Sequence, residues 1–408
     1  MRLGNSPARY GFVSKLFHWL TALLIVTIIP LGITANGMAE AFRQATPDSA
    51  ADLTRAALLF SMHKTLGLTI FLTALARIAW TMSQTKPRPL HPERRIELLA
   101  AETVHWLLYG SLLLVPLTGW FSHAATTGFA PIWWPFGQNL PFIPVDPVLA
   151  SILSGLHKVL EWVLVVALAL HIAGALKHHL IDRDQTLLRM WFGRRDLPHP
   201  QAHPRSALPI VLAVTVWAMA LGAGLLSGAI SAHRGSVATP EPLAQPRSDW
   251  QVEQGSLTLT ITQLGTPVTG AFADWTAAIA YADPSAPGVA GQVRVEVSIA
   301  SLTLGSVTDQ ALRPDFLDHA AHPTATYSAE IQRTDTGHVA NGILTLRGIS
   351  MPVLLPFSLQ IHDDVATMSG QVDLNRLDYG IGAALADQKT LGQTVTIAVE
   401  LVARRTIP

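Results

Sequence analysis

Five long apolar stretches, separated by short polar segments, dominate the first part of the chain. They cover residues 16–35, 58–82, 103–125, 149–175 and 207–231. A helix needs about 20 apolar residues to cross the hydrocarbon core of a bilayer. The pattern therefore predicts five membrane-spanning helices.

Beyond residue 248 the apolar positions recur with a period of two. Leu257, Leu259 and Ile261 alternate with serine and threonine, and the valines of 293–299 alternate with polar residues. Such alternation in about eight short segments indicates an antiparallel sheet that buries one face and closes into a barrel. The stretch 308–320 is more helix-like. Proline, alanine and serine dominate 233–248, which predicts a linker.

Charge and composition support a membrane protein with two unlike parts. Only 14% of the residues are charged, whereas soluble domains carry about 25%. Residues 1–247 hold 20 basic and 12 acidic side chains, and residues 248–408 hold 8 and 16. The overall balance predicts no nucleic-acid partner. The chain has no cysteine, which excludes disulfides, iron–sulfur clusters and thiolate zinc sites.

Lysine and arginine gather in alternate polar segments of the helical part. The N-terminal tail and the second and fourth connections between spans hold 13 of them, whereas the first connection holds two and the third none. Because basic loops stay on the cytoplasmic side, we expect a cytoplasmic N-terminus. Five spans then place the C-terminal part on the opposite side of the membrane.

Four histidines lie within the predicted spans at two depths. His18 is near the inner end of the first span and His63 near the outer end of the second. His157 and His171 lie at the two ends of the fourth span, ~21 Å apart along a helix and on one face of it. Facing imidazoles suit six-coordinate haem iron, an electron-transfer site. We therefore predict two haems, held by His18 with His171 and by His63 with His157. The alternative is that these histidines form hydrogen bonds between helices or lie in the headgroup region.

Two further histidines lie near the predicted inner haem. His105 is followed by tryptophan, as His18 is. Because of this similarity, His105 is an alternative to His18 as the ligand of the inner haem. His178 follows His171 by seven residues and lies on nearly the same helix face. His105 and His178 can otherwise serve a quinone carbonyl or a haem propionate, or lie in the headgroup region without a cofactor.

Three cations complete the set of candidate site residues. Arg77 lies near the inner end of the second span, where it is either a propionate partner or a side chain that snorkels to the headgroups. Lys64 and Lys158 each follow a predicted outer ligand. They can bind the outer propionates, attract a small anion or snorkel.

The N-terminal part resembles the bacterial cytochrome b561 family over about residues 8–193. The segments that carry this resemblance are KLFHWLTALLIV, MHKTLGLTIFLTALARIAW, LHKVLEWVLVVALALHIAGALKHHL and DRDQTLLRMWFG. It implies a four-helix protein that binds two haem b groups, is linked to quinone, and uses the histidine pairs given above as axial ligands. It also implies that His105 and His178 lie near a quinone site. The fifth span departs from the four-span pattern.

The C-terminal part looks like the YceI-like family. The segments LRPDFLDHAAHPTATYSA, GILTLRGISMPVLLPFSL and LNRLDYGIG carry the resemblance, which covers much of 249–405. It implies a lipocalin-like barrel that holds an isoprenoid lipid or a quinone tail. Candidate lining residues are Phe272, Trp275, Phe316 and Phe357; a barrel filled by its own side chains is the alternative.

The expected architecture is a membrane α-helical bundle, with a four-helix di-haem core plus a fifth span, fused to an antiparallel lipocalin-like β-barrel. We expect a di-haem domain at 8–200, a fifth transmembrane helix at 205–232, a linker at 233–248 and a periplasmic barrel at 249–405.

The expected function is electron transfer in the bacterial inner membrane, between a periplasmic-side donor or acceptor and ubiquinone. Two haem b groups would carry the electrons, and the barrel would bind an isoprenoid lipid or quinone. Superoxide is one candidate donor, because Lys64 and Lys158 can attract a small anion. The alternatives are an electron-relay subunit of a larger dehydrogenase and a non-enzymatic carrier of isoprenoid lipid.

Overall fold

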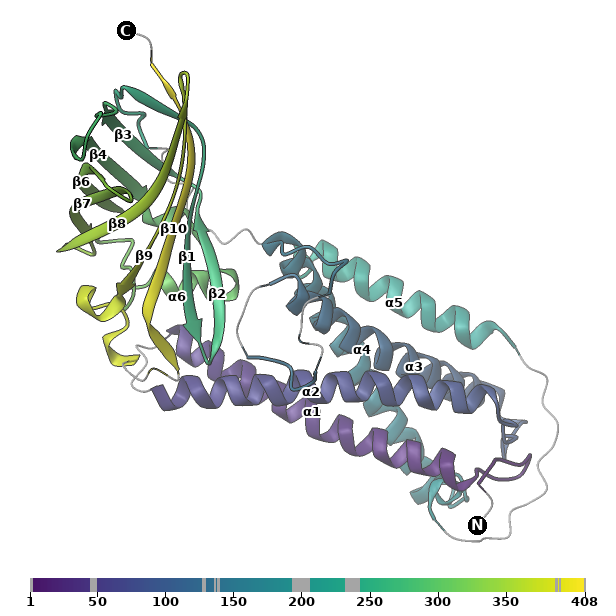
Figure 1. The fold of residues 1–408 in the computed structure, drawn as a ribbon. Helices are drawn as coiled ribbons and strands as arrows, with labels where there is room; N and C mark the ends of the chain where they lie inside the picture. Colours follow the sequence, from purple (N-terminus) through teal and green to yellow (C-terminus); the bar gives the residue numbers. More distant parts are fainter. Residues whose placement is uncertain are drawn as a thin grey trace. The chain divides into compact units, whose positions relative to one another are not determined.

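The computed structural model describes residues 3–44, 50–126, 130–135, 137, 140–192, 206–231, 243–385, 388 and 390–406. It contains a helical region and a β region, each described by itself below (Figure 1). Most of the linker predicted at 233–248 lies outside the described residues. So do residues 193–205, with three of the arginines that predict the orientation.

Five helices in the described part of the chain are long and apolar enough to cross a membrane, as predicted. They are α1 (Phe12–Gln44), α2 (Ala50–Met82), α3 (Arg95–Ala124), α4 (Pro147–Leu180) and α5 (Leu208–Leu226). Helix α4 begins where the Asp146 carboxylate accepts hydrogen bonds from the backbone N–H groups of Val148 (2.7 Å) and Leu149 (3.2 Å). A capping aspartate followed by proline is a strong helix start.

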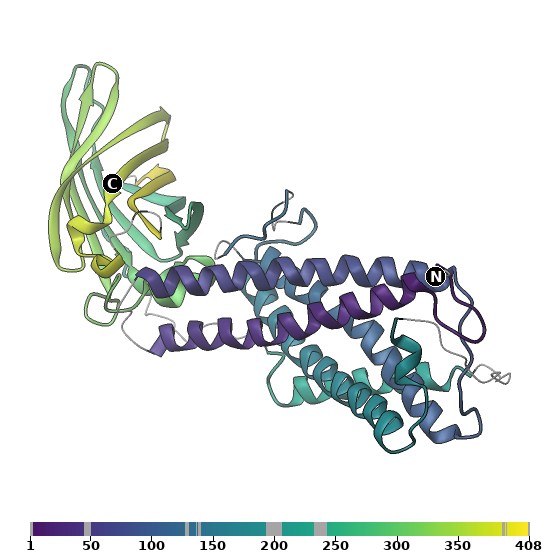
Figure 2. The same ribbon diagram turned by 90° about the horizontal axis from the view of Figure 1, so that it is seen from below.

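The helices pack through small residues and aliphatic side chains. Helices α1 and α2 run side by side (Figure 2), and Ile25 of α1 packs with Ile70 of α2 and Leu112 of α3. Helix α5 lies against α3 and α4, where Ala213 joins a buried cluster with Leu107, Val163 and Ala167. The fifth span is therefore packed into the bundle and buries apolar side chains against α3 and α4.

The segment after α4 folds back onto the N-terminal end of the bundle. It contains the short helix η1 (Leu187–Met190). The buried guanidinium of Arg189 donates to the carbonyl oxygens of Arg88 and Ala8, both at 3.0 Å. The ammonium of Lys15 donates to the Trp191 carbonyl at 2.7 Å. These bonds join the N-terminal tail, the second connection and the segment after α4, which are the three segments predicted to share one side.

The β region is a closed antiparallel barrel, as predicted. Its strands are β1 (Trp250–Gln263), β2 (Thr266–Phe272), β3 (Trp275–Tyr281), β4 (Gly288–Ser298), β5 (Leu302–Thr303), β6 (Thr324–Thr334), β7 (Gly337–Leu346), β8 (Ile349–His362), β9 (Val365–Asn375) and β10 (Leu391–Arg405). Strand β10 pairs with both β9 and β1 and closes the ring. Strands β2 and β3 succeed each other along β1, so the ring has eight positions, and the short β5 pairs with β2.

One secondary-structure prediction in the barrel was wrong in extent. The stretch 308–320 is helical only in α6 (Thr308–Ala311) and then continues as turns. Pro314 explains the early end, because a proline disfavours the helical conformation of the residue before it. The turns that follow return the chain to β6 at the end of the barrel.

Candidate functional site

Three histidines meet at the level of the bundle that the sequence predicts to be the inner one. The ring centres of His18 on α1 and His171 on α4 are 6.1 Å apart. His105 on α3 also lies near His171, at 5.1 Å between ring centres, and its ring is nearly perpendicular to that of His171. Nδ1 of His105 lies 2.6 Å from the Ala101 carbonyl oxygen and must donate to it, which leaves Nε2 with a free lone pair. The structure thus brings both predicted partners of His171 to it.

Two histidines at the outer level each rest against a glycine. A Cβ atom added to Gly32 of α1 would stand 2.7 Å from the imidazole of His63 on α2. A Cβ atom on Gly119 of α3 would stand 2.9 Å from the imidazole of His157 on α4. Nδ1 of His157 donates to the Val115 carbonyl at 2.8 Å. The absence of a Cβ atom at Gly32 and Gly119 therefore lets each imidazole lie against the neighbouring helix, in space that any larger residue would fill.

A further histidine at this level was missed by the sequence analysis. His123, near the C-terminal end of α3, interacts electrostatically with Lys64, His63 and His157. His63 also interacts electrostatically with His157. The signal that could have found His123 is its place at the outer end of the third span, at the depth predicted for the outer pair.

The three candidate cations occupy different surroundings. The guanidinium of Arg77 lies 5.3 Å from the centre of the Tyr109 ring and interacts electrostatically with His18, His105 and His171. Lys64 is buried, whereas Lys158 is exposed. Arg77 therefore accompanies the inner histidines, and the two lysines, although both next to outer histidines in sequence, are not equivalent.

His178 belongs to a charged cluster at the end of α4. Its Nδ1 lies 2.8 Å from the Asp184 carboxylate and 3.0 Å from that of Asp182. Ligand atoms of Glu97, His178 and Asp182 lie within 4.8 Å of one another, a spacing that suits a metal ion. The Lys177 ammonium already lies 2.8 Å from both Glu97 and Asp182, and it holds the pKa of Asp182 below its usual range. The carboxylates thus already surround a cation.

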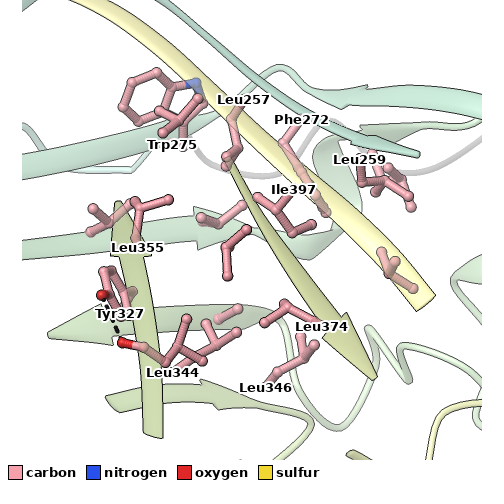
Figure 3. A pocket seen from close by; sticks show the side chains of 18 of the residues that line it. Leu257, Leu259, Phe272, Trp275, Tyr327, Leu344, Leu346, Leu355, Leu374 and Ile397 are labelled. Atoms are coloured by element: carbon pink, nitrogen blue, oxygen red, sulfur yellow. Dashed lines mark hydrogen bonds between the residues drawn. The ribbon is translucent and has the colours of Figure 1, made fainter. Parts of the chain in front are cut away.

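The barrel encloses a cavity of about 320 Å³ whose walls are almost wholly apolar. Leucine and isoleucine side chains from facing strands point into it (Figure 3). The four aromatic residues named from the sequence all line it: Phe272, Trp275, Phe316 and Phe357. The hydroxyl of Tyr327 donates to the Ala340 carbonyl at 2.7 Å, and burial raises its pKa to about 12. The barrel is therefore hollow, and its own side chains do not fill it.

Comparison with known families divides the chain in the same way. Residues 9–193 match prokaryotic cytochrome b561, and residues 250–403 match the YceI-like domain. The chain joins a cytochrome b561 domain to a YceI-like domain. It is a multi-pass membrane protein, because the match to cytochrome b561 covers four of the five apolar helices in the described part of the chain.

Individual relatives cover either one part or the other. Cytochrome b561 homolog 2 of Escherichia coli (strain K12) is 29% identical over 196 residues, which are 47% of this chain and 95% of that protein. The probable superoxide oxidase CybB of Yersinia pestis is 26% identical over 184 residues, 45% of this chain and 95% of that protein. The crystal structure of BcnA from Burkholderia cenocepacia is 24% identical, with a TM-score of 0.34, over 36% of this chain and 95% of that chain.

The cytochrome b561 family implies haem b, and the residues of the bundle fit that group. Two imidazole nitrogens that bind one metal ion from opposite sides, each at ~2 Å, would lie ~4 Å apart, with their ring centres ~6 Å apart. The 6.1 Å between His18 and His171 matches this spacing better than the 5.1 Å between His105 and His171. At the outer level, His63 packs closely against Gly32 and His157 packs closely against Gly119, which holds both imidazoles within the bundle. Electron transfer is accordingly the activity that the cytochrome b561 domain supports.

Proposed function

We propose that the protein is a di-haem b-type cytochrome that transfers electrons between a donor or acceptor outside the membrane and ubiquinone. The observation that carries the proposal is the placement of histidine partners at both ends of α4. His171 faces His18 at 6.1 Å between ring centres, and His157 lies within electrostatic range of His63. One helix thus offers an iron ligand at each level of the membrane.

The chain's own residues prepare these positions. Haem b, when bound, supplies a one-electron carrier. The Nδ1–H of His157 donates to the Val115 carbonyl, which fixes the tautomer and points the lone pair of Nε2 away from that bond. Arg77 supplies positive charge beside the inner histidines, where it can hold a propionate. In this proposal His105 and His178 lie toward the quinone.

The test is the visible absorption spectrum of the detergent-purified protein, oxidised and then reduced with dithionite, together with a haem assay. We expect about two low-spin b-type haems per chain. A protein that takes up no haem from cells with an adequate haem supply would contradict the proposal.

Superoxide is the candidate donor that we favour. A relative that covers the same part of the chain is a probable superoxide oxidase, and two lysines adjoin the proposed outer ligands. Lys158 is exposed and can attract an anion from solution, and Lys64 is buried beside the histidines. Positive charge that surrounds an entry site raises the encounter rate of an anion.

Replacement of both lysines by glutamine should lower the rate of superoxide-driven quinone reduction by about tenfold at low ionic strength. The rate should also depend less on salt, because salt screens the steering field. Stopped-flow measurement across a salt series tests this. The matched control is Lys86→Gln, since Lys86 is exposed and paired with Glu102 at 2.8 Å. An unchanged salt dependence in the double variant would exclude charge steering.

We further propose that the protein lies in the bacterial inner membrane, with its N-terminus in the cytoplasm and the barrel in the periplasm. The basic segments support this orientation, and the proposed domain limits remain 8–200, 205–232, 233–248 and 249–405. In this topology the fifth span carries the barrel across the membrane.

The absence of cysteine permits a direct test of this orientation. A single cysteine at Thr336, an exposed residue of the β6–β7 turn, should react with a membrane-impermeant maleimide in intact spheroplasts. A single cysteine at Thr85, exposed in the α2–α3 connection, should react only after lysis. The reverse result would invert the topology.

For the barrel we propose an isoprenoid lipid or the tail of a quinone as the ligand. The apolar cavity supports a long apolar molecule. Organic extraction of the gently purified protein should release an isoprenoid. If extraction releases none and added quinone is not taken up, the barrel has another role.

Two rival functions make different predictions. An electron-relay subunit would show no activity with quinone when purified alone. A lipid carrier that uses the helices only as an anchor would function unchanged after replacement of His63 and His157. The spaced histidines favour electron transfer over the lipid carrier, and activity with quinone separates the proposed function from the relay subunit.

A further inference from the structure

Two histidines from different segments share one carboxylate oxygen at the end of α4. Nδ1 of His178 lies 2.8 Å from Oδ2 of Asp184, and Nε2 of His91 lies 3.3 Å from the same oxygen. His91 belongs to the connection between α2 and α3, whereas Asp184 follows α4. Nδ1 of His91 in turn lies 3.1 Å from the Glu93 carboxylate. These four side chains therefore form a continuous chain of titratable groups, each within 3.3 Å of the next.

This chain of groups leads from water to the end of a membrane-spanning helix. The exposed fraction of the side chain falls from 66% at Glu93 to 34% at His91 and 11% at Asp184. His178, in the last turn of α4, is 21% exposed. Its Nδ1 is directed to the carboxylate, so Nε2 is the nitrogen that remains for a substrate. An imidazole accepts a proton at one nitrogen and donates from the other, so both histidines can pass protons along the chain.

The neighbouring charges distinguish Asp184 from the other carboxylates of the cluster. Lys177 lies 2.8 Å from both Glu97 and Asp182. Arg94 lies 3.1 Å from Asp182 and 3.4 Å from Glu97, so two permanent cations balance these two carboxylates. In the described part of the chain, the ion pairs of Asp184 are both with histidines. Because histidine titrates near neutral pH, Asp184 favours a proton on one of its two partners.

We propose that Glu93, His91 and Asp184 supply His178 with the protons that a quinone takes up when it is reduced. Conversion of a quinone into a quinol consumes two electrons and two protons. The electrons come from the donor, which is oxidised; two superoxide ions, for example, leave as two molecules of dioxygen. Each proton enters from water at the Glu93 end, and Nε2 of His178 donates a proton to a quinone oxygen, so that the chain of groups returns to its starting state. This inference rests on the proposed quinone-linked function and names the residues that provide its protons.

A purely structural role for the same contacts is the alternative. In that case His91 and Asp184 only hold the α2–α3 connection against the end of α4. The two roles differ in what a variant loses. Loss of a structural contact affects every reaction of the protein, whereas loss of a proton path slows only the reaction that consumes protons.

The experiment follows reoxidation of the dithionite-reduced, detergent-purified protein by decylubiquinone, without oxygen, in the visible haem spectrum. His91→Gln and Asp184→Asn interrupt the chain of groups but keep polar side chains of similar size. Each should slow reoxidation by decylubiquinone by about tenfold or more. Reoxidation by ferricyanide, which takes up electrons without protons, should keep its wild-type rate, and the affinity for decylubiquinone in equilibrium binding should not change. Added imidazole should restore part of the rate in His91→Gln, because it can carry protons to Asp184.

The matched control is His179→Gln, which removes an exposed histidine next to His178 that is not part of the chain of groups; decylubiquinone should reoxidise it at the wild-type rate. Wild-type rates with decylubiquinone in both His91→Gln and Asp184→Asn would overturn the inference. So would an equal slowing with ferricyanide, since the contacts would then have only a structural role. If decylubiquinone does not reoxidise the wild-type protein, the quinone-linked function itself fails, and the inference fails with it.

Discussion

Replacement of His63 by alanine is expected to lower the haem content of the purified protein from about two per chain to about one. His63 is the proposed outer partner of His157, and its imidazole lies in the space that Gly32 leaves open. Alanine removes the ligating nitrogen without adding bulk. The haem assay should show the loss, and the reduced spectrum should keep the bands of the inner haem.

The matched control is His179→Gln. His179 lies on the same helix as His157 and His171 but is exposed, so its replacement should leave both haems in place. Full haem content in the His63→Ala protein would exclude His63 as a ligand and direct attention to His123, which lies within electrostatic range of His157.

The same assay distinguishes the two candidates for the inner partner of His171. The 6.1 Å spacing favours His18 over His105, so His18→Ala should lose the inner haem. His105→Ala should retain it and affect quinone reduction instead. Loss of the inner haem only in the His105 variant would reverse this assignment.

The spans and the barrel were predictable because each is determined by a local pattern. A bilayer sets the length of an apolar helix, and a sheet with one buried face sets a period of two. The ends of the helices were less predictable. Helix α3 begins at Arg95, whereas the apolar stretch begins at residue 103. Its first turns carry Glu97 and Glu102. These charged residues lie outside the apolar stretch, although they belong to the helix.

The candidate site was predictable where the depth of a histidine in its span, or the spacing of two histidines along one helix, was enough. The shared face of His157 and His171 follows from their spacing along α4. The glycines beside the outer histidines could not be predicted, because Gly32 and His63 belong to different helices and meet only through packing. Arg376 was missed for a related reason. Its guanidinium donates to five backbone carbonyls, which belong to the loop before β10 and to β10 itself. No spacing in the sequence predicts that arrangement.

Replacement of Arg376 by methionine is expected to lower the free energy of unfolding of the barrel by about 3–5 kcal/mol. Methionine fills a similar apolar volume but leaves five buried carbonyls without their charged donor. The segment between β9 and β10 then loses its main attachment to the start of β10. Denaturation followed by tryptophan fluorescence should show an earlier transition, while haem absorbance should report an unchanged membrane domain.

Two further variants separate the loss of hydrogen bonds from a general effect of losing an arginine. Arg404→Met removes an exposed arginine paired with Glu253 at 2.6 Å and should leave the transition where it is. Arg376→Lys keeps a positive charge but has three donors in place of five, so its stability should lie between those of the wild type and Arg376→Met. If Arg376→Met unfolds at the same denaturant concentration as the wild type, water replaces the guanidinium as the hydrogen-bond donor to these carbonyls.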